Sequence, residues 1–197
     1  AYFIRDKKVA EVPCFEDIEE VDFGEEIGVL EAAVTSGGLS TMPWTYEGKI
    51  NTLENKTLRY HGHWKEMIAY RQLGLFNEEI ISYNGKDISP REFYHSLLEP
   101  QISKGNPHDI CIMRTTASGK RNNAILSRTV ECIEYYDKDT EFLAMEQWTG
   151  FHASMVMQHI VNGHLDVGAW PIEKALSGKD FFKYAMMRCY KIEITEH

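Results

Sequence analysis

The sequence has no uninterrupted apolar run near the length that spans a bilayer, which argues against a membrane-spanning helix. It also has no excess of positive charge: 21 Lys and Arg stand against 30 Asp and Glu, a formal net charge of -9 at pH 7. The negative charge is spread along the chain, which disfavours nucleic acid or an anionic membrane as the partner. The N-terminus carries no signal-peptide pattern, and it begins without Met inside an expected strand, which indicates a fragment of a longer protein.

Cysteine is scarce and its spacing is wide. The four residues are Cys14, Cys111, Cys132 and Cys189, and no two of them form a C-x-x-C pair. Because Cys111 and Cys132 lie in apolar, strand-like runs, we predict buried, reduced thiols in a cytoplasmic protein. The spacing favours neither disulfides nor a zinc site.

Three motifs of common enzyme classes are missing. There is no G-x-G-x-x-G turn for a dinucleotide, no P-loop, and no G-x-S-x-G elbow of a serine hydrolase. The small-residue segments 35–38 and 118–120 do not have the required spacing. His61 and His63 flank a glycine, but no acidic or cysteine cluster nearby supplies further metal ligands, so we predict a hydrogen-bonded turn and no metal site.

What the chain does have is the composition of one folded domain. It is 197 residues long, 43% hydrophobic, and contains 10 Tyr, 9 Phe and 4 Trp. In its first half we expect a hairpin around residues 5–8, a central strand at 27–34, and a hairpin at 80–88 turning on Asn84-Gly85. Ser89, Pro90 and Glu92 predict a capped helix start, with a core-facing set formed by Phe93, Leu97 and Leu98.

The second half is expected to hold an antiparallel meander. Its three consecutive strands are predicted at 109–116, 124–136 and 141–148. A helix at 149–161 follows, with an apolar stripe formed by Phe151, Met155, Val156, His159 and Ile160, and it is closed by Gly163. A short helix at 180–188 and a strand at 192–194 complete an α+β fold: a mixed, mostly antiparallel sheet with helices on one face.

Residues 54–74 are expected to join a strand to a helix. A strand runs to Gly62, and an amphipathic helix follows, with Trp64, Met67 and Ile68 on one face and Gly74 at its end. Thr57, Arg59 and His61 alternate on one face of the strand. Arg59, at this strand-to-helix mouth, can bind a carboxylate through two parallel hydrogen bonds, although an ordinary surface arginine fits the pattern as well.

Two further segments are candidates for ligand contact. Ser36 and Gly38 belong to a turn of small and hydroxyl residues after the strand at 27–34, where the backbone can approach a ligand closely. Thr149 and Gly150 open the helix expected at 149–161. The first N–H groups of a helix attract anions, and Thr149 equally suits a plain N-cap.

The order of several motifs resembles the C-terminal domain of the saccharopine dehydrogenase family. Residues 56–64 read Lys-Thr-Leu-Arg-Tyr-His-Gly-His-Trp, close to the family's T-L-R-Y-x-G-H/F pattern, and Leu73-Gly74 follows as its L-G. Residues 30–41, Ser89-Pro90-Arg91 and Trp148-Thr149-Gly150 agree in order. The resemblance implies a fold similar to the C-terminal half of glyceraldehyde-3-phosphate dehydrogenase.

The resemblance also implies a function. Members of the family join or split an amino acid and an aldehyde through an imine, using NAD(P) bound mainly by an N-terminal Rossmann domain that this chain does not include. The chain would be the substrate-binding and dimerisation domain of a cytoplasmic, homodimeric enzyme of lysine metabolism and amino-acid biosynthesis, inactive alone. The implied substrate-binding residues are Thr57, Leu58, Arg59, Tyr60, Ser36, Gly38, Thr149 and Gly150.

The sequence departs from the family at one basic anchor. The family has a P-N-R-D-S motif after the strand corresponding to residues 30–34, whereas residues 36–40 here contain no arginine. The substrate therefore stays open between saccharopine and another amino-acid or polyamine-like imine conjugate. No catalytic residue is assigned, because the family's proton-transfer groups belong largely to its nucleotide half. A non-catalytic oligomerisation or small-ligand-sensing domain is the alternative.

Overall fold

The computed structural model describes residues 1–105, 108–188 and 190–197. By its own contacts the chain divides into two compact units, Ala1–Gly105 and Asn106–His197, and each is described by itself. The prediction of one substrate-binding and dimerisation domain over residues 1–197 stays a prediction. None of the described helices combines the length and the apolar character that crossing a membrane requires.

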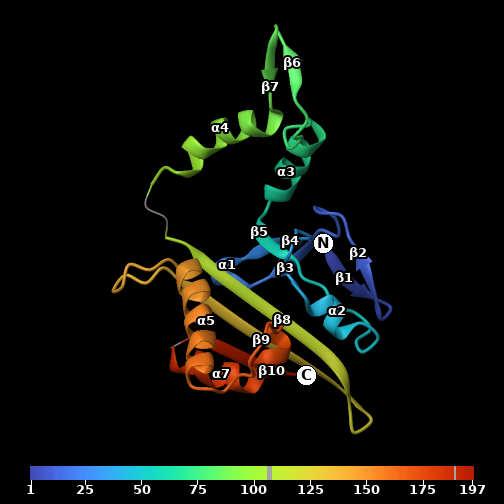
Figure 1. Ribbon diagram of the computed structural model, residues 1–197, viewed down its shortest axis with the longest axis vertical. Coiled ribbons are helices and arrows are strands. Elements are labelled where there is room, and N and C mark those ends of the chain that lie inside the picture. Colours follow the sequence, from blue (N-terminus) through green and yellow to red (C-terminus); the bar gives the residue numbers. More distant parts are fainter. Residues whose placement is uncertain (106–107, 189) are drawn as a thin grey trace. The chain divides into compact units, whose positions relative to one another are not determined.

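The first unit contains three small antiparallel sheets (Figure 1). Strands β1 (Tyr2–Arg5) and β2 (Lys8–Glu11) form the expected N-terminal hairpin. The sheet that positions the candidate site has the order β3-β4-β5, from β3 (Glu19–Asp22), β4 (Val29–Ala33) and β5 (Thr57–Tyr60). Buried Phe3, Val12 and Val34 form a core beside it.

Short helices and one hairpin complete the first unit. Helix α1 (Gly24–Ile27) lies between β3 and β4, and α2 (Met42–Tyr46) and α3 (His63–Gln72) flank β5 in the chain. Strands β6 (Ile81–Tyr83) and β7 (Lys86–Ile88) form the predicted hairpin, in which Asn84 and Gly85 both have positive φ, 51° and 72°. Helix α4 (Pro90–Ile102) follows.

Helix α4 confirms its predicted start and corrects its predicted face. The Ser89 side chain accepts a hydrogen bond from the N–H of Glu92, as an N-cap does. However, Phe93 and Leu97 are 52% and 56% exposed, Leu98 alone of the predicted set is half-buried, and no residue of the helix is fully buried. The helix turns Tyr94 inward instead, where its ring contacts those of Tyr70 and Phe76.

The second unit is a three-stranded antiparallel sheet with helices packed against it. Its order is β10-β9-β8, from β8 (Ile110–Arg121), β9 (Ala124–Tyr135) and β10 (Ile192–Glu196). Helix α5 (Ala144–Val161) packs against β8 and against α7 (Gly178–Met187), and the short α6 (Ile172–Ala175) lies between them in the chain. Gly163 closes α5 with a φ of 69°, as expected.

The predicted third strand at 141–148 is wrong. Residues 144–148 are the first turns of α5, and the third strand of the sheet is β10. The segment contains the short apolar run 142–145, which suits a strand or a helix, yet Ala144, Met145, Glu146 and Gln147 are good helix formers, and helix propensity prevails here. The α+β class is confirmed, although the single expected sheet is four small antiparallel ones in the described chain. The likeness to glyceraldehyde-3-phosphate dehydrogenase stays a prediction.

The burial of the described cysteines can be compared with the prediction. Cys111 and Cys132 are buried, as predicted, while Cys14 is half-buried, and all three are free. Burial raises the pKa of the Cys132 thiol to about 11, so it stays protonated and unreactive near neutral pH. Cys189 lies outside the described residues.

Candidate functional site

The start of β5 lies beside the small-residue turn after β4. The two strands are antiparallel neighbours with Ala33 opposite Thr57, so the chain after β4 meets the chain before β5. The hydroxyl oxygens of Thr35 and Thr57 are 2.6 Å apart. At Gly38, a Cβ atom would lie 1.9 Å from Asn55 Oδ1, so a side chain there would have to displace Asn55. The turn that contains Ser36 and Gly38 is thus brought to Thr57.

Glu31 organises the other end of β5. It lies opposite Arg59 in the sheet, and its side chain is only 13% exposed. Its Oε2 accepts the N–H of Gly62 at 3.1 Å, and its Oε1 lies 2.9 Å from His61 Nδ1. A half-enclosed carboxylate with these two partners fixes the turn that joins β5 to α3.

Gly62 makes the reversal into α3 possible. Its φ of +92° lies in the left-handed region that side chains disfavour, and it stands immediately before the helix. One residue inside the helix, the buried Trp64 donates its indole N–H to the backbone oxygen of Glu31 at 2.9 Å. Trp64 therefore anchors α3 to β4. The predicted inward face is confirmed, since Met67 and Ile68 are half-buried beside it.

Arg59 is exposed at this mouth. Its guanidinium carbon lies 5.9 Å from the centroid of the Trp64 ring, and Nη1 donates to the backbone oxygen of Leu58 at 2.7 Å. Over the described residues no carboxylate pairs with Arg59, because Glu31 is already bound to the turn. Carboxylate partners are found for several other arginines: Arg5, Arg91, Arg114 and Arg128.

The charge of Arg59 acts on a neighbour. The pKa of His63 is lowered, first by burial of its ring and next by the positive charge of Arg59. His63 is therefore held neutral more strongly than an exposed histidine. Of the remaining predicted residues in β5, Leu58 is half-buried, whereas Tyr60 is 66% exposed on the opposite face from Arg59.

Thr149 and Gly150 do not open a helix, so that prediction is wrong. Both lie on the second turn of α5, and the Thr149 hydroxyl donates to the backbone oxygen of Met145 at 2.8 Å. The free N–H groups at the helix start belong to residues five positions earlier. There the carboxylate of Asp109 accepts the N–H of Ala144 at 2.7 Å and that of Met145 at 2.9 Å. Sequence reasoning missed Asp109, which lies 35 residues from its partner.

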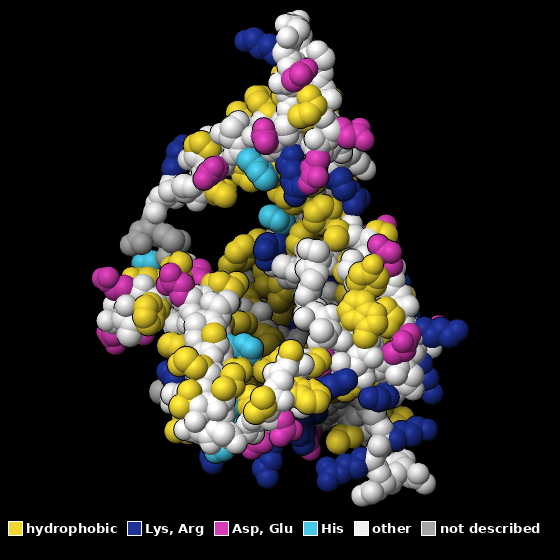
Figure 2. All heavy atoms as spheres, in the orientation of Figure 1, with side chains coloured by type: hydrophobic (Ala, Val, Ile, Leu, Met, Phe, Trp, Pro, Cys, Tyr) yellow, Lys and Arg dark blue, Asp and Glu magenta, His cyan; other side chains and the backbone are white. Residues whose placement is uncertain are grey.

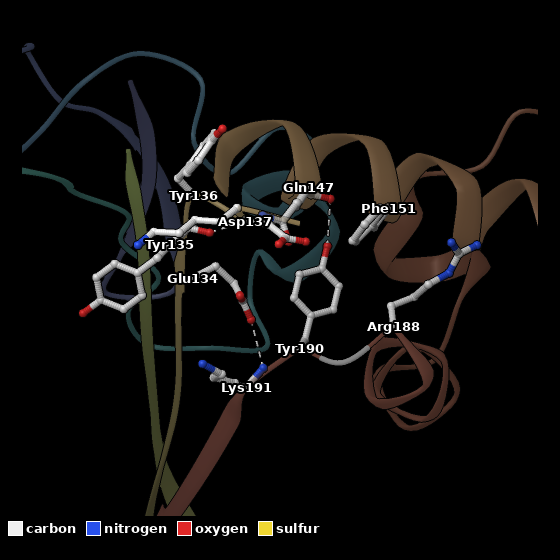
Figure 3. Close-up of a pocket in the computed structure, with 10 residues that line it drawn as sticks. Glu134, Tyr135, Tyr136, Asp137, Gln147, Phe151, Arg188, Tyr190 and Lys191 are labelled. Atoms are coloured by element: carbon white, nitrogen blue, oxygen red, sulfur yellow. Dashed lines mark hydrogen bonds between the residues drawn. The ribbon is translucent and has the colours of Figure 1, made fainter. Parts of the chain in front are cut away.

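The second unit contains a cavity of about 410 Å³ between the end of β9, the first half of α5 and residues 188 and 190–191, which lie between α7 and β10 in the chain (Figure 3). Tyr190 stands in it, and its hydroxyl donates to the backbone oxygens of Gln147 and Trp148 at 3.2 and 3.4 Å. Arg188 lies on the other side of Tyr190 from Glu134. No motif in the sequence indicates this cavity, since its lining comes from three separated segments.

The model of the saccharopine dehydrogenase C-terminal domain matches residues 1–191. The chain belongs to this family. It is thus a domain of an oxidoreductase family, and the matched range includes both β5 with its T-L-R-Y segment and the cavity of the second unit.

Two kinds of binding site can be assessed in the part of the chain that the structure describes, a metal site and a dinucleotide site. Among the described side chains, no three His, Cys, Asp or Glu residues gather as a metal site would need. The chain has no G-x-G-x-x-G turn, and the strand pairings in its described part are antiparallel, so its residues do not fit a dinucleotide in the Rossmann manner.

Proposed function

We propose that this domain binds and orients a carboxylate-bearing substrate for a saccharopine dehydrogenase-like, NAD(P)-dependent oxidoreductase acting on an amino-acid imine conjugate. In this proposal an N-terminal nucleotide-binding domain of the same protein holds NAD(P), and the enzyme is a cytoplasmic homodimer of lysine metabolism. The single observation that carries the proposal is Arg59, an exposed guanidinium without a carboxylate partner in the described chain, within the family's T-L-R-Y segment.

An exposed arginine without a carboxylate partner is unexpected in a chain with this charge balance. Acidic residues outnumber basic ones by 30 to 21, so an exposed arginine has many possible partners. The nearest acid across the sheet, Glu31, is committed to His61 and Gly62. The planar guanidinium keeps donors available for an incoming carboxylate, and a charge-assisted hydrogen bond of this kind is worth about 1.5–3 kcal/mol.

The surroundings suit a positioned substrate. Arg59 is backed by the Trp64 ring, which is buried and hydrogen-bonded to β4, so the strand that carries the guanidinium is held firmly. At the other end of β5, the Thr35–Thr57 pair and the turn containing Ser36 and Gly38 offer hydroxyl and backbone groups. Holding a substrate carboxylate on such a rigid edge lowers the entropy cost of bringing its reacting carbon into place.

The test is Arg59→Ala in the complete enzyme, assayed with saccharopine and NAD(P). We expect kcat/KM to fall by roughly ten- to a hundredfold, the loss of one charge-assisted contact, with little change in the melting temperature because the side chain is exposed. Lys65→Ala, an exposed cation on the adjacent helix, is the matched control. An unchanged kcat/KM for Arg59→Ala sinks this role.

One observation favours the alternative, a non-catalytic oligomerisation or sensing domain. Apolar side chains of the β6–β7 hairpin and α4 are exposed, as Figure 2 shows over this part of the first unit, with Ile80, Ile81 and Phe93 each more than half exposed. Such a surface suits self-association. Fusing the chain behind a nucleotide-binding domain separates the two functions, because only the first proposal predicts imine reduction by the fusion.

A further inference from the structure

The cavity of the second unit has the features of a binding site that the proposed function does not use. We propose that it binds a small organic carboxylate, with the anionic group on Arg188 and the apolar body of the ligand against the rings of Phe151 and Tyr190. The inference is independent of the proposed function, because it rests on side chains of the second unit alone.

The size and the walls of the cavity fit a small organic molecule. Its volume of about 410 Å³ is within the range of about 300–1,000 Å³ in which small-molecule sites fall. The rings of Phe151 and Tyr190 meet edge to face, with centroids 6.1 Å apart. Tyr190 is tied to the backbone of α5 by its hydroxyl, so this aromatic wall is fixed in position.

The acids that line the cavity are already bound within the protein. Glu134 Oε1 accepts the N–H of Lys191 at 3.0 Å (Figure 3). The carboxylate of Asp137 accepts the Thr140 hydroxyl at 2.7 Å and the N–H of Asp139 at 2.9 Å, which closes a local turn. These hydrogen bonds lower the pKa of Asp137.

The cations that line the cavity are not balanced in this way. Within the parts of the chain that the structure describes, no carboxylate pairs with the side chains of Lys138, Arg188 or Lys191. Arg188 is half-buried, and its guanidinium carbon lies 5.6 Å from the centroid of the Phe151 ring. A partly enclosed guanidinium beside an aromatic ring gains most from an anion, because its loss of hydration is otherwise uncompensated.

Tyr190 stands between two side chains of opposite charge, Glu134 and Arg188 (Figure 3). Burial, together with the neighbouring Cys132 and Glu134, raises the pKa of Tyr190 to about 12, and Arg188 acts in the opposite direction. Arg188 is thus near enough to act on the tyrosine hydroxyl, and Tyr190 remains a neutral wall at any ordinary pH. The positive charge that acts on this part of the cavity is therefore that of Arg188.

The ligand class follows from the two walls together. Inorganic phosphate would satisfy the cation but leave the rings in water, and a neutral aromatic molecule would cover the rings but leave Arg188 without an anion. A monocarboxylate with a ring or a short apolar chain satisfies both. 3-Phenylpropionate is a suitable probe, and 3-phenylpropionamide differs from it only in lacking the charge.

The experiment is a titration of the complete protein, followed by calorimetry and by the backbone amide NMR signals of the residues that line the cavity. We expect saturable binding of 3-phenylpropionate, and at least tenfold weaker binding of both the amide and inorganic phosphate. Arg188→Gln should raise the Kd for 3-phenylpropionate about tenfold, whereas Lys183→Gln, an exposed cation on α7 away from the lining, should not change it.

Each other outcome overturns the inference. If 3-phenylpropionate and 3-phenylpropionamide bind with the same Kd, Arg188 does not bind the carboxylate. If inorganic phosphate binds as tightly as 3-phenylpropionate, the rings do not contribute. Absence of binding, or shifts only outside the cavity, removes the site itself. Should Arg188→Gln fold poorly, Arg188→Lys replaces it, because lysine keeps the positive charge and loses only the planar fork of donors. We expect Arg188→Lys to weaken the binding of 3-phenylpropionate less than replacing that ligand by 3-phenylpropionamide does in the wild type.

Discussion

At the turn between β5 and α3, one carboxylate determines the position of its neighbours. Glu31 holds the N–H of Gly62 and the His61 ring with its side chain, and its backbone oxygen accepts the Trp64 indole. Because Glu31 is occupied in this way, Arg59 directly opposite it is left without an acid. The same residue that fixes the turn thus keeps the guanidinium available for a substrate.

The pKa of His63 reports on the position of Arg59. Arg59→Gln should raise the pKa of His63, because it removes the positive charge that opposes protonation of the ring. The measurement is an NMR titration of the His63 ring signals in both proteins, with Lys65→Gln as the control. An unaltered His63 titration in Arg59→Gln would place the guanidinium away from this helix start.

The same shift has a consequence for stability. Because the folded pKa of His63 lies below its unfolded value of 6.5, the unfolded chain binds more protons as the pH falls. The free energy of unfolding should therefore be at its full value above pH 6.5 and decrease as the pH falls from there through the folded pKa. His63→Gln should reduce this dependence in denaturant titrations at several pH values, and an identical pH dependence in the variant would exclude His63 as its source.

At the scale of elements, helix α5 depends on a cap from elsewhere in the chain. Asp109, at the start of β8, accepts two N–H groups of the first turn of α5, and Glu146 accepts the N–H of Leu143 at 2.9 Å. These bonds satisfy donors that a helix start otherwise leaves free, and the negative charges oppose the positive end of the helix dipole. The start of α5 is therefore fixed at residue 144.

A start of α5 at residue 144 predicts different results for two substitutions. Asp109→Ala should lower the free energy of unfolding by about 1–2 kcal/mol, the usual cost of losing an N-cap. Thr149→Ala should leave it unchanged or raise it slightly, since Thr149 lies inside the helix and alanine has the better helix propensity. Chemical denaturation measures both. A loss at Thr149 with none at Asp109 would support a helix that begins at 149 instead.

Some elements of the fold could be predicted from the sequence, and others could not. Signals that act within a few residues were sufficient: Asn84-Gly85 for the hairpin, Ser89 for the start of α4, Gly163 for the end of α5. The start of α5 was missed because its cap comes from Asp109 and because the short apolar run 142–145 before and within its first turn suits a strand as well as a helix. The outward face of α4 was missed because a helical stripe does not reveal whether the fold provides a surface to cover it.

At the scale of the whole molecule, part of the predicted site follows from sheet topology. Ser36, Gly38, Thr57 and Arg59 lie within one sheet and its end turn because β4 and β5 are neighbours. Thr149 and Gly150 belong to the other unit, on the second turn of a helix. The cavity around Tyr190 could not be predicted, because it depends on how β9, α5 and β10 meet.

Both units of the chain belong to the same family domain. The saccharopine dehydrogenase C-terminal domain model extends over both of them, and the chain itself has no dinucleotide turn. A substrate-orienting domain that depends on a separate nucleotide-binding domain is consistent with both facts. The proposed contact between Arg59 and a carboxylate of the substrate can be removed either from the enzyme or from the substrate.

The most direct measurement is a double-mutant cycle in the complete enzyme. Saccharopine carries three carboxylates, so three analogues can be made, each with one carboxylate replaced by a carboxamide. Saccharopine and the three analogues are assayed with the wild-type enzyme and with Arg59→Ala. The account predicts that one analogue lowers kcat/KM by roughly ten- to a hundredfold in the wild type and by far less in Arg59→Ala, because the partner is already gone. Equal losses in both enzymes for all three analogues would contradict it.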